Sequence, residues 1–301
     1  TDVGNATVTA TFSTTSTNYN VPASTTATIT VTAKPVTVEW SMERLVYTGL
    51  PQAHTAGFTD VFGTVQSLDV TGKSTIAGTH TATAVVSSWT NYSFLAQTQD
   101  YTIVKAPLTI AADDKRMTAG DECPDLTVTY KGFVNGETAT VLTGDLKVET
   151  DYKKGDPVGK YPIRASGCTS DNYEITYVAG VMQVDPIQFT VTILGSYIYN
   201  GSEQTVGYTV IDTGGNALTK GVHYTATGDS ATHAGTNTLT VTGIGDCLGV
   251  VVTEDWSISK APLTIAAKDE SASYGDDVPT LTASYTGFVA GETESVLGGT
   301  L

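Results

Sequence analysis

The 301-residue sequence has little of what disulfide scaffolds, zinc sites and membrane spans require. It contains only three cysteines, at positions 123, 168 and 247. These are too few for a disulfide-dense scaffold, and their spacings fit no zinc-binding or Cys-x-x-Cys pattern. No apolar run approaches the roughly 20 residues that cross a bilayer, and residues 1–4 do not begin a signal peptide. We expect no membrane insertion in this segment, and we expect an excerpt whose export and anchoring signals lie outside it.

Basic residues are also scarce. The sequence has 15 Lys and Arg against 31 Asp and Glu, which gives a formal net charge of −16. Such a surface repels phosphate backbones and anionic lipid headgroups, so nucleic-acid binding is disfavoured. The ordinary interpretation of this acidity is a soluble, self-repelling surface.

Sequence motifs of catalysis and phosphate binding are missing as well. No Gly-x-Ser-x-Gly, His-Glu-x-x-His or phosphate-binding loop occurs. We therefore predict no catalytic residues, no cofactor and no enzyme activity.

The composition that remains favours small packed β domains. Apolar residues make up 40% of the chain and charged residues 15%, which argues against disorder. Thr, Val and Gly are plentiful, and long runs of Ala, Leu, Glu and Lys do not occur. Strand-forming chemistry therefore prevails.

The strongest feature of the sequence is an internal repeat. Residues 105–112 (KAPLTIAA) return as residues 260–267, and sliding 105–146 onto 260–301 without a gap matches roughly 25 of the 42 positions. A second pattern, Ala-Gly-Thr within an alternating strand, occurs at 77–79 and again at 234–236. The chain is therefore a row of modules of two alternating kinds.

These repeats divide the chain into five segments. The terminal segments are the C-terminal half of one module and the N-terminal half of another, and three complete modules lie between them. The predicted boundaries are 1–34, 35–105, 106–185, 186–260 and 261–301.

Segments 35–105 and 186–260 are expected to consist of strands alone. Alternation predicts strands at 36–40, 45–47, 77–85 and 100–104 in the earlier one. In the later one, residues 197–201 predict a hairpin, because Asn200-Gly201 readily takes the positive φ angles of a type I′ turn.

Segment 106–185 mixes strands with one short helix. Strands are predicted at 107–112, 126–130, 146–150, 160–165 and 173–184, and residues 135–142 supply an Asn cap with helical apolar spacing. One helix against about five strands is the arrangement of a β-grasp-like fold. The expected fold class is mainly β, with small sandwich-like modules alternating in tandem with β-grasp-like ones.

The module junctions have almost no linker. The final strand of one module leads straight into the next first strand at Lys105 and at Lys260. Neighbouring modules should therefore stack end to end with limited hinge freedom. Because strands of eight to ten residues are roughly 30 Å long, we expect an elongated rod.

Several stretches resemble the MBG (mostly-β, glycine-rich) family of bacterial surface repeats. The resemblance is close over 106–185 and 261–301, and it departs from the family at 118–120, where Tyr-Gly is lost, and at Cys123 and Cys168. Residues 35–105 and 186–260 resemble bacterial Ig-like repeats through Tyr-x-Gly at 47–49 and 199–201 and the two Ala-Gly-Thr strands. The MBG resemblance rests on residues 106–110, 132–138, 157–163, 171–173 and 274–276.

The resemblance implies a segment of a large secreted or wall-attached bacterial protein, often an adhesin. Repeats of this kind typically form a stalk that carries a separate binding head, and they have no catalytic residues to carry over. Partners are then the neighbouring modules of the same parent protein.

Cys123 and Cys168 are a candidate disulfide. Both lie in predicted loops of segment 106–185, and both depart from the residues usual in the family. A paired departure indicates contact, and a bridge around a loop of roughly 45 residues would add a few kcal/mol. The alternative is two free thiols, and Cys247 stays single in either case.

Tryptophans are the candidates for binding sugars by ring stacking. Trp40 and Trp256 lie in alternating strands, where core packing is the ordinary role. Trp89 lies in a turn beside Tyr92, so Trp89 and Tyr92 are the predicted surface contact for a ligand, with packing as the alternative.

A metal site has weak support. His223 and His233 flank Asp229 on a predicted hairpin, but whether they meet depends on an unknown register. His54 and His80 have no evident partners. Acidic pairs at 113–114, 121–122 and 276–277 lack the alternating spacing of a calcium loop, so solvated turns are expected.

Lys105 and Lys260, at strand starts, raise the idea of a Lys-to-Asn amide bond. Such a bond needs a buried Lys, an Asn or Asp and an acidic catalyst in contact, and no such set can be placed. A lysine that contacts the neighbouring module is the expected role.

Two hypotheses follow for the function. The favoured one is a structural stalk or spacer of a bacterial cell-surface or secreted adhesin-like protein, and the rival is a module that binds a glycan or a host protein. Because half modules expose strand edges, segments 1–34 and 261–301 are expected either to complete each other head to tail between molecules or to be poorly packed.

Overall fold

The computed structural model describes residues 2–299, so Thr1, Thr300 and Leu301, the outermost residues of the two terminal segments, lie outside the described part. The chain divides into two compact units. The first contains the chain up to Ala112 together with Val128–Val148 and Ala165–Val178. The second contains Asp113–Thr127, Glu149–Arg164 and the chain from Ala179 onward. The five predicted segments stay a prediction.

The fold is mainly β. Within residues 2–299 the helices are three single 3-10 turns: η1 (Ala139–Val141), η2 (Gly245–Cys247) and η3 (Glu294–Val296). In the same part of the chain, no helix has the length and apolar character needed to cross a membrane.

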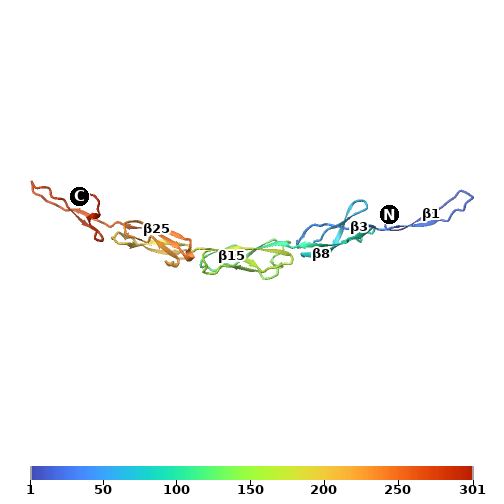
Figure 1. Ribbon diagram of the computed structural model, residues 1–301, viewed down its shortest axis with the longest axis horizontal. Coiled ribbons are helices and arrows are strands. Elements are labelled where there is room, and N and C mark those ends of the chain that lie inside the picture. The colour runs from blue at the N-terminus through green and yellow to red at the C-terminus, as the bar shows by residue number, and fades with distance from the viewer. Residues whose placement is uncertain (1, 300–301) are drawn as a thin grey trace. The chain divides into compact units, whose positions relative to one another are not determined.

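The first unit begins with a hairpin of β1 (Gly4–Ala10) and β2 (Thr25–Val31), drawn in dark blue in Figure 1. The strands pair antiparallel from Gly4 opposite Val31 to Ala10 opposite Thr25. Every residue of the two strands is exposed except the half-buried Val31. The hairpin is therefore held by its ladder and has no core of its own.

Segment 35–105 forms a six-stranded sheet and a parallel pair. The sheet order is β4-β6-β7-β8-β10-β5, and β3 pairs with β9. Phe58 of β6 is fully buried against Phe94 of β9, so the small pair packs on the larger sheet. The strands are β3 (Lys34–Thr37), β4 (Glu39–Trp40), β5 (Leu45–Val46), β6 (Ala56–Thr59), β7 (Val65–Thr71), β8 (Gly78–Val85), β9 (Tyr92–Leu95) and β10 (Thr98–Val104).

Segment 106–185 forms two sheets. One has the order β13-β11-β16 and the other the order β12-β17-β15-β14, and each contains one parallel pairing, β11 with β16 and β12 with β17. The strands are β11 (Ala106–Ala112), β12 (Lys115–Thr118), β13 (Val128–Lys131), β14 (Lys147–Thr150), β15 (Gly159–Ser166), β16 (Tyr173–Val178) and β17 (Gly180–Asp185).

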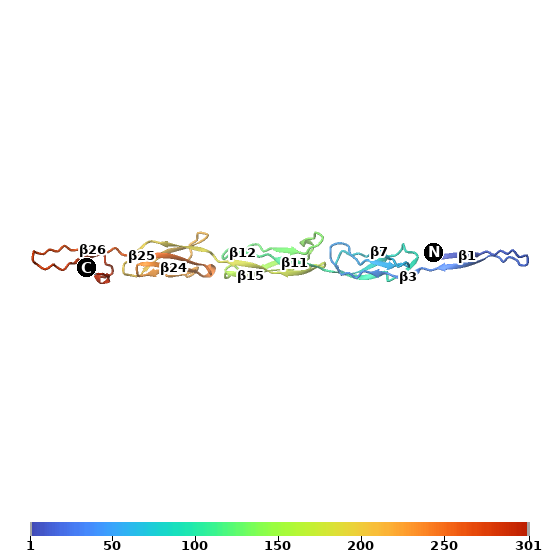
Figure 2. The same cartoon turned by 90° about the horizontal axis from the view of Figure 1, so that it is seen from above.

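Segment 186–260 repeats the plan of segment 35–105. Its central pair, β24 and β25, lies side by side in Figure 2 and matches the pair β8 and β10. A short strand joins the edge in parallel in both cases, β19 on β25 and β5 on β10. The strands are β18 (Phe189–Leu194), β19 (Tyr197–Ile198), β20 (Gln204–Thr205), β21 (Gly207–Asp212), β22 (Tyr224–Thr227), β23 (Ser230–Ala231), β24 (Gly235–Gly243) and β25 (Val251–Ser259).

The chain then continues into β26 (Thr264–Ala267) and β27 (Ala283–Thr286), which pair antiparallel. All four residues of β26 are exposed. Among the described residues, β26 has no second strand neighbour.

The helix predicted at 135–142 is wrong. Asn135 and Gly136 have φ angles of 51° and 73°, in the left-handed region, so the chain turns where a helix would start. Thr138 is extended and its side chain caps nothing, and only η1 follows. β-branched residues at 138, 140 and 141 disfavour further helical turns.

The hairpin predicted at 197–201 is also wrong. β19 pairs in parallel with β25, and β20 pairs with β23. Gly201 has φ 78°, but Asn200 is not among the residues of positive φ that a type I′ turn requires. Asn200 Oδ1 instead accepts a hydrogen bond from the Ser202 N–H at 2.9 Å.

Phe58 and Phe62 test the core of segment 35–105 with one residue type. Phe58 is 0% exposed and Phe62 is 88% exposed. Phe58→Ala should lower the free energy of unfolding by about 3–5 kcal/mol, because it leaves a cavity. Phe62→Ala should change it by less than about 0.5 kcal/mol. Denaturant unfolding followed by tryptophan fluorescence measures both, and equal effects would contradict this core.

Candidate functional site

A contact between segments 35–105 and 106–185, inside the first unit, is the candidate functional site. Tyr47 directly after β5, Glu137 after β13 and Tyr173 at the start of β16 form what we call the Glu137 junction. The Tyr47 hydroxyl donates to Glu137 Oε1 at 2.6 Å, and the Tyr173 hydroxyl donates to Oε2. One carboxylate thus accepts hydrogen bonds from both segments.

An apolar core surrounds the Glu137 junction. Its buried residues come from β8 and β10 on one side of residue 105 and from β11 and β16 on the other. The rings of Tyr47 and Tyr173 meet edge to face, with centroids 5.4 Å apart. One core therefore continues across the segment boundary, and its buried members are Tyr47, Ala82, Tyr101, Ile103, Ala106, Leu108 and Tyr173.

Backbone groups near Asn172 strengthen this contact. Asn172 Oδ1 accepts from the Ala77 N–H at 2.9 Å, and its carbonyl accepts from the Ala106 N–H at 3.0 Å. Lys105 Nζ donates to the Ser170 carbonyl at 2.7 Å. The start of β16 is thus tied to both segments.

Asn91 makes the same pair of bonds one segment earlier. Its Oδ1 accepts from the Val3 N–H at 2.9 Å, and its carbonyl accepts from the Lys34 N–H at 3.0 Å. In both places the Asn precedes a Tyr that begins a strand parallel to the first strand of its segment. The Asn-Tyr pair is therefore a recurring device at segment boundaries.

Burial and the carboxylate together change the acidity of the junction tyrosines. Burial, followed by the hydrogen bond to Glu137, raises the pKa of Tyr47 to about 12. The same two causes, in the same order, raise the pKa of Tyr173. Both hydroxyls therefore stay protonated and remain donors at neutral pH.

A second contact of this kind lies inside the second unit, between segments 186–260 and 261–301. The Tyr199 hydroxyl donates to Glu292 Oε1 at 2.6 Å, and this hydrogen bond is the main cause that raises the pKa of Tyr199. We call this contact the Glu292 junction. Tyr199 follows β19 as Tyr47 follows β5, and its N–H donates to the Ser259 carbonyl at 2.8 Å as that of Tyr47 does to Val104 at 2.9 Å.

The loop that carries the glutamate has the same backbone in both junctions. Asn135 and Ala290 both have φ 51°, and Gly136 and Gly291 have φ 73° and 77°. A Cβ on Gly132 would lie 2.4 Å from the Pro107 carbonyl oxygen, so the loop passes too close to the first strand for any other residue. The loop thus presents its glutamate from a fixed backbone.

Two stretches of the chain match the MBG domain of the YGX type. They are residues 108–183 and 263–301. The first stretch begins inside β11 and the second contains β26, and each contains the glutamate loop of one junction. The expectation of an MBG-like segment is confirmed for these stretches.

Among solved structures, the chain is similar to two fragments of surface layer protein SbsC. Domains 4–9 match at 16% identity with a TM-score of 0.24, covering 78% of this chain and 49% of that one. Domains 1–6 match at 13% identity with a TM-score of 0.20, covering 95% and 53%. The chain therefore spans about half the length of the solved chains it matches. No curated protein sequence matches it.

The tryptophans all take part in packing. The half-buried Trp89 and Tyr92 meet Phe58 with ring centroids 5.0 and 5.1 Å away. That Trp89 and Tyr92 bind a ligand at the surface stays a prediction. Packing, the alternative role given for them, is what their contacts with Phe58 represent. Trp40 and Trp256 pack in cores, as expected from their strands, and donate to the Ala96 and Gly228 carbonyls.

The candidate bridge between Cys123 and Cys168 is not present in the structure, which instead has the alternative of free thiols. Cys123, Cys168 and Cys247 are all free thiols. Cys168 lies beside Tyr177, whose hydroxyl donates to the Cys168 carbonyl at 2.9 Å. Exposed Cys123 has its Sγ 3.7 Å from the Pro124 carbonyl.

Most of the residues considered for a metal site form hydrogen bonds or ion pairs with other groups. The Thr219 N–H donates to His223 Nδ1 at 2.9 Å, and Asp229 pairs with Lys220 at 2.8 Å. Asp121 and Asp276 accept backbone N–H groups inside their own turns. Over residues 2–299, no group of three His, Cys, Asp or Glu side chains could hold a metal ion.

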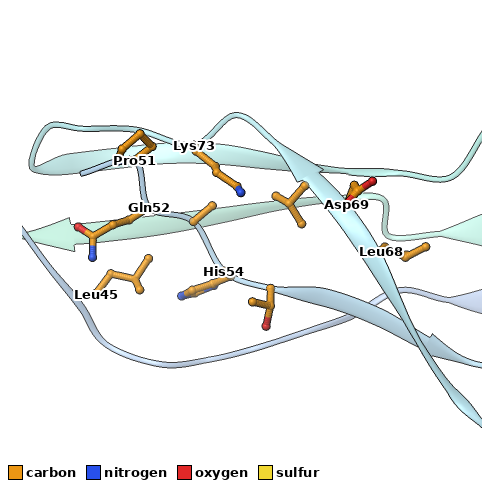
Figure 3. Close-up of a pocket in the computed structure, with 10 residues that line it drawn as sticks. Leu45, Pro51, Gln52, His54, Leu68, Asp69 and Lys73 are labelled. Atoms are coloured by element: carbon orange, nitrogen blue, oxygen red, sulfur yellow. The ribbon is translucent and has the colours of Figure 1, made fainter. Parts of the chain in front are cut away.

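A recess of about 390 Å³ opens beside β7 (Figure 3). His54, only 8% exposed, has Nε2 3.1 Å from the Glu43 carbonyl. Since a carbonyl can only accept, Nε2 carries a proton, and in the neutral ring Nδ1 is then an acceptor. Nδ1 and the buried Gln52 Oε1 have no hydrogen-bond partner among the described residues. Lys73 extends into the same recess (Figure 3), where its ammonium can donate a hydrogen bond to a hydroxyl-bearing ligand.

Neither junction was predicted from the sequence, and neither was the recess. Tyr-x-Gly at 47–49 and 199–201 and the glutamate loop at 132–138 stand out in the sequence only as separate family motifs. The signal that could have joined them is their spacing. Tyr47 and Tyr199 repeat together with Glu137 and Glu292 at nearly the same interval, as two sides of one contact would.

The raised tyrosine pKa values predict a loss of stability in alkali. A tyrosine whose pKa rises on folding stabilises the fold fully below its unfolded pKa of about 10, and this stabilisation is lost toward the folded pKa. For Tyr47 the folded value is about 12. We expect the free energy of unfolding to fall between pH 10 and 12, and to fall less in Tyr47→Phe. Tyrosinate absorbance compared between the two proteins gives the midpoint, and a midpoint near pH 10 would contradict the buried junction.

Thiol labelling tests the state of the three cysteines. Burial, with Asp246 as a smaller cause, raises the pKa of Cys247, and Cys247 is 0% exposed. Without reductant, an alkylating reagent should modify exposed Cys123 first and Cys247 only after unfolding. Intact mass should then show three modified thiols in denaturant. A single modified thiol would instead show one bridge, and peptide mapping would tell whether it joins Cys123 to Cys168.

Proposed function

We propose that the chain is a structural spacer from a large bacterial cell-surface or secreted, adhesin-like protein, and that it performs no catalysis. The observation that carries this proposal is the Glu137 junction, where one apolar core crosses a segment boundary and a carboxylate joins its two sides. The match of two stretches to the MBG domain supports a location at the cell surface.

The energetics favour restraint at the boundary. Each fully buried apolar side chain contributes about 1.5–3 kcal/mol, and core residues on both sides of residue 105 share this burial. Bending at residue 105 would expose them and separate Glu137 from Tyr47. Such a boundary keeps the orientation of the two segments fixed and resists bending between them, as a spacer requires.

In this proposal the three complete modules and two half modules form an elongated rod of alternating Ig-like and β-grasp-like modules. At roughly 30 Å per module its length is roughly 120 Å. The acidic surface keeps such rods apart in solution, since a net charge of −16 opposes association.

Small-angle X-ray scattering tests the spacer. A rod roughly 120 Å long has a radius of gyration of roughly 35 Å. A compact domain of 301 residues has a radius of gyration of about 19 Å. We expect a value above about 30 Å that Phe62→Ala leaves unchanged. A value near 19 Å would overturn the proposal.

The recess at His54 favours a second candidate function, the binding of a glycan or of another hydroxyl-bearing ligand on a host protein. Lys73 lines the recess, where its ammonium can donate a hydrogen bond to a ligand hydroxyl. The volume of the recess, about 390 Å³, falls within the roughly 300–1,000 Å³ of small-molecule pockets.

A glycan array with matched variants separates these candidates. Binding that His54→Phe abolishes and Trp89→Phe preserves would assign the ligand to the recess. Binding that depends on Trp89 would assign it to the predicted contact of Trp89 and Tyr92. No binding by the unaltered chain would leave the spacer as the function.

A further inference from the structure

The four-stranded sheet of segment 106–185 carries a recess of about 350 Å³, which we call the cationic recess. All of its lining residues belong to the second unit. Three of the six are basic and one is acidic, the reverse of the balance in the whole chain, whose formal net charge is −16. The lining residues are Asp114, Lys115, Arg116, Lys160, Val181 and Gln183.

The register of the sheet places an amide between two of these cations. Gln183 of β17 pairs with Arg116 of β12 on one side and with Lys160 of β15 on the other. Residues paired across neighbouring strands share a face of the sheet. Met182 and Val184, on either side of Gln183, are 0% exposed, so the shared face is the outer one. The three residues therefore form a row across three strands, with the two cations about 10 Å apart at the backbone.

Both cations of the row are available to a ligand. The Arg116 side chain is 76% exposed, and its ion pair with Asp185 uses only Nε. Within residues 2–299 its two terminal amino groups make no hydrogen bond, so they can bind an anion while Asp185 holds the guanidinium in place. Lys160 is exposed and takes part in none of the ion pairs of the same part of the chain.

The acid in the lining does not neutralise these cations. Asp114 lies before β12, and its Oδ1 accepts a hydrogen bond from the Val181 N–H at 2.7 Å. Among the described residues it forms no ion pair. The cationic recess therefore keeps an excess of positive charge.

The internal repeat indicates that the fold does not require a basic start to this sheet. Sliding residues 105–146 onto 260–301 places Glu270 and Ser271 at the positions of Lys115 and Arg116. The positive charge is thus a feature of segment 106–185, and a packing role common to both copies of the repeat does not account for it.

Charge and spacing together indicate the class of ligand. Neighbouring side chains on one face of an extended acidic peptide are about 7 Å apart, which is less than the separation of Arg116 and Lys160. That separation is close to the length of a disaccharide. The Gln183 amide both donates and accepts hydrogen bonds, which suits a hydroxyl between two anionic groups. Val181, which is 38% exposed, offers apolar surface to a sugar ring.

We propose that the cationic recess binds an acidic polysaccharide, with carboxylate or sulfate groups on Arg116 and Lys160 and a hydroxyl on Gln183. At physiological ionic strength, charges farther than about 8 Å are largely screened, so the local cations outweigh the acidic surface beyond them. The proposal rests neither on the spacer function nor on the recess at His54, because it concerns a separate site.

Calorimetric titration of the full chain at physiological ionic strength tests the proposal. The chain should bind polygalacturonate, which carries carboxylates, or dextran sulfate, which carries sulfates, and should not bind neutral dextran. The polymer that binds more tightly identifies the anionic group. Gln183→Glu inserts a negative charge into the row with little change of shape and should weaken binding by more than about tenfold.

A matched pair of lysine variants separates a specific site from attraction by charge alone. Lys160→Ala should weaken binding about tenfold, because it removes a charged hydrogen-bond donor. Lys268→Ala removes the same charge from an exposed position of segment 261–301, outside the recess, and should change the affinity less than about twofold. All three variants alter surface residues, so each should keep the unfolding midpoint of the unaltered chain.

Four results would overturn the proposal. The chain binds neither acidic polysaccharide, or Gln183→Glu leaves the affinity unchanged. The two lysine variants weaken binding equally, which would show attraction by net charge. Poly-glutamate binds more tightly than both acidic polysaccharides, which would make an acidic protein the ligand.

Discussion

The sharing of one apolar core across a segment boundary is the constraint on which the rest of this structure depends. Small β domains bury too little surface to be very stable alone. At residue 105 the chain avoids that limit, because Ile103 and Leu108 lie in the same core on either side of it. The carboxylate of Glu137 then fixes the relation of the two sides, since its two oxygens accept from tyrosines of different segments.

The repetition of this contact explains why the sequence repeats as it does. A strand that begins Lys-Ala-Pro, a glutamate loop and a Tyr-x-Gly turn must change together, because they meet in one place. Gly132 and Gly287 both lie against a proline carbonyl, at 2.4 and 2.3 Å for a Cβ placed on each. The Tyr-x-Gly turn and the glutamate loop, which look like separate family motifs in the sequence, are therefore the two sides of one junction.

Much of the strand content could be predicted from the sequence, and the pairing could not. Alternation located β8, β11, β15 and β24, because one face of each is buried. It missed β12 (KRMT) and β6 (AGFT), whose four residues are too short and too mixed to show a period. The helix at 135–142 failed because Asn135 and Gly136 turn left-handed, and the contact of Glu137 with tyrosines far along the chain was invisible to local pattern.

The candidate site residues likewise divide into those whose role could be predicted from the sequence and those whose role could not. Trp40 and Trp256 lie in strands, so their packing was predictable. Trp89 lies in a turn, and only the position of Phe58 reveals that the ring is covered. The unpaired acceptors of His54 and Gln52 depend on the fold of a loop with no periodic signal. The surroundings of Trp89, His54 and Gln52 depend on residues far away in the sequence, so the local pattern does not predict them.

The most direct measurement is native-state hydrogen exchange in the variant Leu108→Ala, read on the other side of the boundary. Leu108 is 1% exposed and belongs to segment 106–185, whereas the Tyr47 N–H, bonded to the Val104 carbonyl at 2.9 Å, reports on segment 35–105. A shared core predicts that the opening free energy at Tyr47 falls by an amount close to the local loss of about 2–5 kcal/mol at β11. An unchanged opening free energy at Tyr47, with the loss confined to β11, would contradict it.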